Sequence, residues 1–320
     1  MGVRLENMAT EKGQVIKTVG STSVVLTENG RHIRCTLTGK YRLEDLKSTS
    51  PVVVGDKVRF EYSPEVDRGR IIEVFDRKNY IIRRASNLSK TYQIVASNID
   101  QLFLLVTVIH PVTYTEFIDR YLVTAEAYNI PAILLFNKID LYEEEETAGM
   151  NELIKIYEDI PYRCIPLSAL RKTNLLPLKE IMKDKLNIFA GVSGTGKSTL
   201  INSLDEHLNI KTRELSEYHK AGKHTTTFVE MYHLSFDAYV IDTPGIKGFG
   251  IIDMDKEPIS HYFPEIFRTS RTCRYHNCNH LNEPGCAVLD ALQGGSISLS
   301  RYTSYISLLE EQNKRSKYRR

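Results

Sequence analysis

The sequence predicts an α/β protein in which a small β-barrel precedes a larger α/β domain and a cysteine-rich module. Three observations support this fold class. Short β-rich runs fill residues 13–75, apolar strands alternate with helical stretches up to Gly250, and three cysteines cluster beyond that point. We place the domain boundaries at 1–78 for the barrel, 79–250 for the α/β domain and 251–320 for the cysteine-rich domain.

The N-terminal region has the pattern of short strands joined by turns. The pair Asn29-Gly30 between two of these strands is a hairpin signal. About five short strands in such a short stretch indicate a small barrel of the oligonucleotide-binding (OB) type. A generic small barrel without a ligand fits the same pattern equally well. The strand-like runs are Val15-Ile16, 23–26, 33–37, 52–54, 58–62 and 69–74.

The central region alternates apolar runs with helical stretches. Continuous apolar strands between helices predict a parallel sheet that is covered on both faces. The acidic run Glu143 to Glu146 fits the solvated start of a helix, where the helix dipole favours negative charge. The apolar runs are 102–108, 132–136, 163–167, 187–190 and 238–241, and the helical stretches are about 116–129, 150–159, 175–184 and 198–206.

Composition and terminal sequences limit the protein class. Lys plus Arg total 42 and Asp plus Glu 40, so the net charge of +2 excludes neither nucleic acid nor protein partners. The N-terminus lacks the apolar core of a signal peptide, and the densest apolar run, 102–109, is far shorter than the ~20 residues that span a bilayer. We therefore expect a cytoplasmic protein without membrane association. No large heptad surface is apparent, so we expect a monomer.

A phosphate-binding loop follows the apolar strand at 186–190 and precedes a helical segment. Its glycines allow backbone N–H groups to converge on phosphate oxygens, and the helix N-terminus adds partial positive charge. Lys197 is the candidate for bridging the β- and γ-phosphates, and Ser198 is a candidate ligand of Mg²⁺. A chance match in a glycine-rich loop is the alternative. The loop and its first helical residue comprise Gly191, Val192, Ser193, Gly194, Thr195, Gly196, Lys197, Ser198 and Thr199.

The segment Asp242-Thr243-Pro244-Gly245 ends the strand at 238–241. An acid at the tip of a buried strand suits a second magnesium ligand, and the Gly245 N–H suits contact with a γ-phosphate. The tetrapeptide alone is a weak signal, because an ordinary strand exit has the same composition. Its position downstream of a phosphate-binding loop makes the signal stronger.

Between these two motifs, residues 220–227 occupy the place of a switch loop. A hydroxyl of Thr225 or Thr226 is a candidate to complete the magnesium shell. Ile246 stands where Ras-like enzymes carry a water-orienting glutamine, and its side chain cannot orient water. His224 is therefore the candidate catalytic residue, although a histidine in a surface loop often has no such role.

Residues that suit guanine recognition lie upstream of the phosphate-binding loop. Asn137, Lys138 and Asp140 follow the strand at 133–136. The Asp140 carboxylate is suited to accept two hydrogen bonds, from N1–H and the 2-amino group of guanine. Adenine offers no matching pair of donors. Ser168 and Ala169 follow the next strand, and we expect the Ala169 N–H near the guanine carbonyl. The full set of motifs therefore predicts binding of GTP or GDP with Mg²⁺, in an order that is cyclically rotated relative to ordinary GTPases.

The cysteine-rich region contains a second constellation. Cys273, Cys278, His280 and Cys286 combine three soft thiolates with an imidazole, a set that suits tetrahedral Zn²⁺. Four protein ligands leave no open position, so the site is expected to be structural. A redox-active cysteine pair is the alternative, and the histidine speaks against it. His276 is expected to be a bystander. The chain up to Cys286 is expected to be irregular, with a helix at 297–313 and a basic tail at 314–320.

With these motifs in place, the chain resembles the circularly permuted GTPases of the RsgA/YjeQ family, which depend on the small ribosomal subunit. The resemblance covers nearly the whole chain, including the barrel, the rotated motif order, the loop 222–227 and the zinc-ligand pattern with the following segment 284–288. The family often has Arg where this chain has Lys223, and both are cationic. The resemblance implies a GTP hydrolase that acts late in maturation of the small (30S) subunit, with the barrel and zinc domain contacting ribosomal RNA.

The resemblance leads to two mechanistic hypotheses. Without a glutamine at Ile246, the free enzyme should be slow, and the small subunit is expected to order 220–227 and bring His224 toward the attacking water. The segment 242–250 leads directly into the zinc domain, so γ-phosphate contact at Gly245 is expected to bias that domain's position.

Basic residues are candidates for RNA contact, although each one is more commonly a solvated surface residue. Two other functions remain open: a GTPase that regulates a complex without RNA, and a module that holds GTP without hydrolysing it. An ATP-dependent kinase does not fit Asp140. The basic candidates are Arg83, Arg84, Arg268, Arg271, Arg274 and the tail 314–320.

Overall fold

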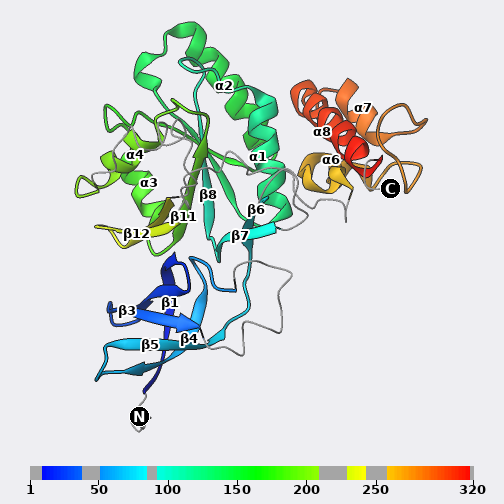
Figure 1. Cartoon of the computed structure of the whole chain (residues 1–320). Helices are drawn as coiled ribbons and strands as arrows, with labels where there is room; N and C mark the ends of the chain where they lie inside the picture. Colours follow the sequence, from blue (N-terminus) through cyan, green and yellow to red (C-terminus); the bar gives the residue numbers. More distant parts are fainter. Residues whose placement is uncertain (1–8, 38–50, 85–91, 209–228, 243–257, 318–320) are drawn as a thin grey trace. The chain divides into compact units, whose positions relative to one another are not determined.

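The computed structural model describes residues 9–37, 51–84, 92–208, 229–242 and 258–317 (Figure 1). The chain divides into two compact units, each assembled from three stretches. The first unit contains Met1–Gln101, Leu176–Phe189 and Leu204–Phe249, and the second contains Leu102–Leu175, Ala190–Ser203 and Gly250–Arg320. Among the described residues, no helix combines the length and the apolar character needed to cross a membrane.

The first unit contains the predicted five-stranded barrel, which lies at the blue end of the colour scale in Figure 1. Each strand pairs with two others in the order β1–β2–β3–β5–β4, and β4 closes the barrel by pairing with β1. Alternate side chains point inward, and the core includes Val15, Val25, Phe60 and Ile71. The strands are β1 Ala9–Val19, β2 Thr22–Thr27, β3 His32–Leu37, β4 Lys57–Ser63 and β5 Arg68–Val74.

A hairpin that the sequence pattern did not indicate follows the barrel: β6, Tyr80–Arg84, pairs with β7, Tyr92–Ser97. A buried carboxylate joins the barrel to it. Asp56 Oδ1 accepts hydrogen bonds from Arg77 Nε at 2.7 Å and Ser97 Oγ at 2.6 Å, and Oδ2 accepts from Arg77 Nη2 at 2.8 Å and the Val53 N–H at 2.9 Å. Four donors therefore satisfy this buried charge.

The first unit also contains strands outside the barrel and the hairpin. β11, Leu186–Gly191, lies parallel to β13, Ala238–Asp242, with Ile188 opposite Ile241. β12, Glu230–Leu234, pairs antiparallel with β13 and, through Glu230, with Lys17 of β1. Strand β12 was not among the apolar runs predicted from the sequence, and it adds an antiparallel pairing to strands that are otherwise parallel as predicted. Helix α3, Leu175–Met182, begins at the boundary of this unit.

The second unit contains three parallel strands: β8, Gln101–Val106, β9, Ala132–Phe136, and β10, Arg163–Pro166. Pairing places Val106 opposite Phe136, and Phe136 opposite Pro166, so the three loops that follow leave the sheet at one edge. β8 is fully buried, as expected for a strand covered on both faces. The helices near these strands are α1, Thr115–Ala127, and α2, Glu144–Glu158.

Helix α2 begins earlier than its apolar pattern indicated. Glu143 and Glu146 form a capping box, in which each side chain accepts a hydrogen bond from the other residue's backbone N–H. The acidic run is therefore the first turn of the helix, as the dipole argument predicted.

The C-terminal part of the second unit is more regular than expected. Two short helices, α6 (Pro264–Ser270) and α7 (Ala287–Gln293), lie within and next to the region predicted to be irregular, and Pro264 occupies the first turn of α6. They group with α8, Leu299–Lys317, in Figure 1. Their shared core includes Phe263, Ile266, Cys286 and Val288.

Candidate functional site

The loop Gly191–Ser198 connects β11 to α4, Lys197–Leu204, as the strand–loop–helix pattern predicted. Three of its glycines have positive φ: 148° at Gly191, 90° at Gly194 and 94° at Gly196. A Cβ at Gly196 would lie 2.5 Å from Asn137 Nδ2, and one at Gly191 would lie 2.8 Å from a backbone oxygen. Both glycines are therefore required by conformation and by close approach.

Lys197 turns its ammonium group back onto the loop. Nζ donates to the Gly191 carbonyl at 2.7 Å and to the Val192 carbonyl at 2.9 Å. Burial lowers the pKa of Lys197 to about 8. The two carbonyls hold the ammonium beside the backbone of the loop, where a bound anion would favour its charged form.

Asn137 is the structural centre of the site. It follows β9, the residue is only 1% exposed, and it bridges two loops that come from distant parts of the sequence. Its Nδ2 donates to the Thr195 carbonyl at 2.7 Å, and its Oδ1 accepts from the Ala169 N–H at 2.9 Å. The phosphate-binding loop, the Asn137–Asp140 segment and the Ser168–Ala169 loop therefore converge at one place.

The residues beside Asn137 hold the same edge together. Lys138 has a φ of 70°, and its Nζ donates to the His110 carbonyl in the loop after β8. Burial lowers the pKa of Lys138. The Asp140 carboxylate accepts a hydrogen bond from Ser168 Oγ, which fixes its orientation. We expected the Ala169 N–H to face a guanine carbonyl; here it donates to Asn137 instead.

Tyr142 is a positioning residue that the sequence reasoning missed. Its hydroxyl donates to the Asn137 carbonyl at 2.7 Å and accepts from the Val108 N–H at 3.0 Å. It thus links the loop after β8 to the Asn137 segment. A tyrosine two residues beyond Asp140 carries no local signal of this role, because the contact depends on strand order.

The candidate magnesium ligands are only partly described. Ser198 lies in the first turn of α4 and is half-buried. Asp242 is the last residue of β13, directly after Ile241, which pairs with β11. Gly245, His224, Thr225 and Thr226 lie outside the described residues, so their expected roles stay predictions.

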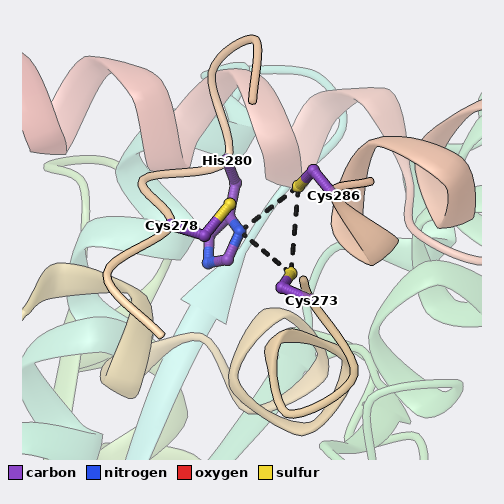
Figure 2. A group of neighbouring side chains, drawn as sticks. All are labelled: Cys273, Cys278, His280 and Cys286. Carbon is purple, nitrogen blue, oxygen red and sulfur yellow. Dashed lines mark hydrogen bonds between the residues drawn. The ribbon is translucent and has the colours of Figure 1, made fainter. Parts of the chain in front are cut away.

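The four predicted metal ligands come together in the second unit (Figure 2). Their ligand atoms all lie within 4.8 Å of one another. His280 Nδ1 lies 3.7 Å from Cys273 Sγ and 3.4 Å from Cys286 Sγ, and these two sulfurs are 4.0 Å apart. Zinc–sulfur bonds of about 2.3 Å give tetrahedral edges of about 3.8 Å, so the arrangement fits Zn²⁺. His276 is not a member of the group.

Residues outside the ligand set organise the loop that carries His280, which has a φ of 59°. Glu283 accepts hydrogen bonds from the N–H groups of Asn279 and Leu281, both at 2.8 Å, and of Asn282 at 3.1 Å. These bonds lower the pKa of Glu283 to about 2, against an opposing effect of desolvation. The carboxylate therefore stays charged and holds the loop in shape. A lone glutamate within the cysteine pattern gave no sequence signal for this role.

Comparison with known proteins supports one family. The family description "RsgA GTPase" matches residues 74–252. The small ribosomal subunit biogenesis GTPase RsgA of Bacteroides fragilis strain YCH46 is 52% identical over 308 residues, covering 96% of this chain and 99% of the relative. The protein of that name from Christiangramia forsetii is 50% identical over 301 residues, covering 93% and 96%.

Solved structures agree with the sequence comparison. The crystal structure of YjeQ from Thermotoga maritima matches with a TM-score of 0.80 and 34% identity, covering 95% of this chain and 99% of that one. YloQ, described as a circularly permuted GTPase, matches with a TM-score of 0.75 and 27% identity, covering 98% of each chain. The rotated order of motifs, the converging loops at Asn137 and the full-length similarity lead to one conclusion: the chain belongs to the RsgA GTPase family.

Proposed function

We propose that this chain hydrolyses GTP and acts in the cytoplasm as a biogenesis factor of the small ribosomal subunit. The observation that carries the proposal is the convergence of three loops on Asn137 in a chain that is about half identical to RsgA proteins over nearly its whole length. The functional division at 1–78, 79–250 and 251–320, and a monomeric state, belong to the same proposal.

Guanine selectivity rests on Asp140. A carboxylate is an acceptor only, so it suits the adjacent N1–H and 2-amino donors of guanine and does not suit the adenine edge. The hydrogen bond from Ser168 Oγ holds the carboxylate in place. The aliphatic stem of Lys138 covers one face of the base, and Asn137 keeps the surrounding loops together.

The phosphates lie against the loop 191–198 in this proposal. Lys197 exchanges its two backbone carbonyls for β- and γ-phosphate oxygens, and the α4 N-terminus supplies partial positive charge. Ser198, Asp242 and a hydroxyl of Thr225 or Thr226 hold Mg²⁺, which neutralises charge on the phosphates. The Gly245 N–H contacts the γ-phosphate.

Hydrolysis requires a water molecule placed in line with the γ-phosphate. Ile246 cannot place it, so we assign that task to His224, with the small subunit ordering residues 220–227. His224→Ala should keep GDP affinity and lose most of the turnover stimulated by the subunit. Unchanged stimulation in steady-state phosphate release would remove His224 from the mechanism.

The cysteine–histidine site holds Zn²⁺ as a structural ion, and the barrel and the C-terminal domain bind ribosomal RNA. Basic side chains would supply phosphate contacts whose strength falls with salt. The segment 242–250 leads into the C-terminal domain, so contact of Gly245 with a γ-phosphate would bias that domain's grip on RNA. The proposed basic contacts are Arg83, Arg84, Arg268, Arg271, Arg274 and the tail 314–320.

The decisive experiment measures GTP turnover by the full chain alone, with purified small subunits and with large subunits. Strong stimulation by small subunits alone supports the proposal. Stimulation by neither particle would favour a GTPase of a non-ribosomal complex, and binding of GTP without phosphate release under any condition would favour a non-catalytic module. Binding of neither GTP nor GDP would contradict every version.

A further inference from the structure

Arg301 of α8 is completely buried, with a side-chain exposure of 0%. Its guanidinium lies between two other helices. Nη1 donates to Asp119 of α1 at 2.7 Å, while Nε and Nη2 donate to the two carboxylate oxygens of Glu265 in α6 at 2.7 and 3.1 Å. The cation also lies 4.6 Å from the ring centre of Phe263. One side chain therefore joins three helices.

The charges around Arg301 make this junction depend on all of its members. Asp119 is fully buried, and the Tyr157 hydroxyl of α2 also donates to its Oδ1 at 2.9 Å. Without Arg301, the buried Asp119 and Glu265 carboxylates would both lose the cation that neutralises them. The buried Asp119 side chain of α1 therefore depends on α8 for its countercharge, so α1 and α8 are expected to stay packed together.

The next turn of α8 holds the metal-ligand loop. Tyr302 OH donates to the His280 carbonyl at 2.6 Å, and Tyr305 OH donates to the Asn279 carbonyl at 2.8 Å. Cys286, which Figure 2 shows in the ligand group, shares one buried core with Tyr305 and with Val123 of α1. The backbone of a proposed zinc ligand is thus fixed by the same helix that carries Arg301.

The N-terminal end of α1, near Asp119, follows a loop that reaches the nucleotide pocket. The loop that precedes α1 includes His110, whose carbonyl accepts the Lys138 ammonium. A Cβ at Gly194 would lie 3.4 Å from Pro111 of the same loop, which places that loop against the phosphate-binding loop. Contacts therefore run from the zinc-ligand loop through α8 and α1 to two elements of the pocket.

We propose that α8, anchored by Arg301, couples occupancy of the cysteine–histidine metal site to retention of guanine nucleotide. The inference rests on the proposed function at the nucleotide pocket. The proposed coupling runs through contacts of α8 and α1 and does not use the segment 242–250. Metal loss would release the loop held by Tyr302 and Tyr305, loosen the docking of α8 on α1, and free the loop at His110 and Pro111 to move.

The test measures dissociation of fluorescent mant-GDP from the full chain, loaded with zinc or treated with a zinc-selective chelator in excess magnesium. In the unsubstituted protein, chelation should speed dissociation at least about fivefold, the lower end of common allosteric couplings. In Arg301→Met, and in Tyr302→Phe combined with Tyr305→Phe, dissociation should already be faster and chelation should add less than about twofold.

The tyrosine variant removes only two hydroxyl groups, so it keeps the test decisive if Arg301→Met fails to fold. Arg59→Met is the matched control, because Arg59 pairs with Glu73 on the barrel surface at 2.6 Å. It should respond to chelation like the unsubstituted protein. An unchanged dissociation rate after chelation, or a full chelation effect in the tyrosine variant, would overturn the inference. Failure of the zinc-loaded protein to bind mant-GDP would instead overturn the proposed function and remove the basis of this inference.

Discussion

Replacing Asn137 by alanine is the sharpest perturbation of the proposed nucleotide pocket. The substitution removes the donor to the Thr195 carbonyl and the acceptor of the Ala169 N–H. Both partners are buried, with Thr195 at 0% and Ala169 at 2% exposure, so water cannot replace the lost bonds without movement. Each unsatisfied buried group costs ~1–3 kcal/mol.

The two groups together cost about 2–6 kcal/mol if the loops stay in place. The loops will relax to recover part of this, so we expect a loss of about 3 kcal/mol in nucleotide binding, which corresponds to roughly 100-fold in Kd. Equilibrium titration with mant-GDP measures this loss directly, and thermal unfolding without nucleotide separates it from global destabilisation. Asn151→Ala, an exposed position in α2, is the matched control. A Kd for Asn137→Ala within threefold of the unsubstituted value would refute the reasoning.

Three further outcomes are expected. Asp140→Asn should reduce the preference for GDP over ADP at least about tenfold, since an amide loses the paired acceptors for guanine; unchanged selectivity in competition titrations would exclude Asp140 as the base reader. Burial lowers the pKa of Lys197 to about 8, so the free protein loses this positive charge as pH rises through 8. GDP affinity measured by calorimetry should therefore fall above that pH, binding near pH 8 should take up protons, and Lys197→Arg should remove the dependence. Cys286→Ser should release zinc and lower Tm, while Cys35→Ser in the barrel should keep the metal content; full zinc content in Cys286→Ser by elemental analysis would contradict the assigned ligand set.

Local sequence patterns predicted those features that depend on residues close together in the sequence. The glycines of the loop 191–198 have conformations that few other residues adopt, so the sequence spacing of these glycines predicted the loop between a strand and a helix. The apolar runs before Asn137 and Ser168 predicted strands of a parallel sheet, and the parallel pairing of β8, β9 and β10 confirms this. The cysteine–histidine spacing likewise indicated the four residues that converge in space.

Features that depend on long-range packing were not visible in the sequence. Helix α6 has seven residues, too short for a periodic pattern to develop, so its region was wrongly expected to be irregular. Helix α7, also of seven residues, was not predicted and directly follows that region. Arg301 lies in an ordinary polar helix sequence, and only its burial between Asp119 and Glu265 distinguishes it from a solvated arginine. Strand β12 was missed because its antiparallel pairing depends on β13 and β1.

The saturated carboxylate of Asp56 bears on how this chain should be divided for study. Two of its four donors come from Arg77 and one from Ser97, nearly twenty residues beyond the proposed barrel boundary. Asn98 adds a further bond from its Nδ2 to the Gly55 carbonyl at 3.0 Å. A fragment intended to carry the barrel alone should therefore extend through residue 98, because a shorter one would lose the Ser97 donor to Asp56 and the Asn98 bond to Gly55.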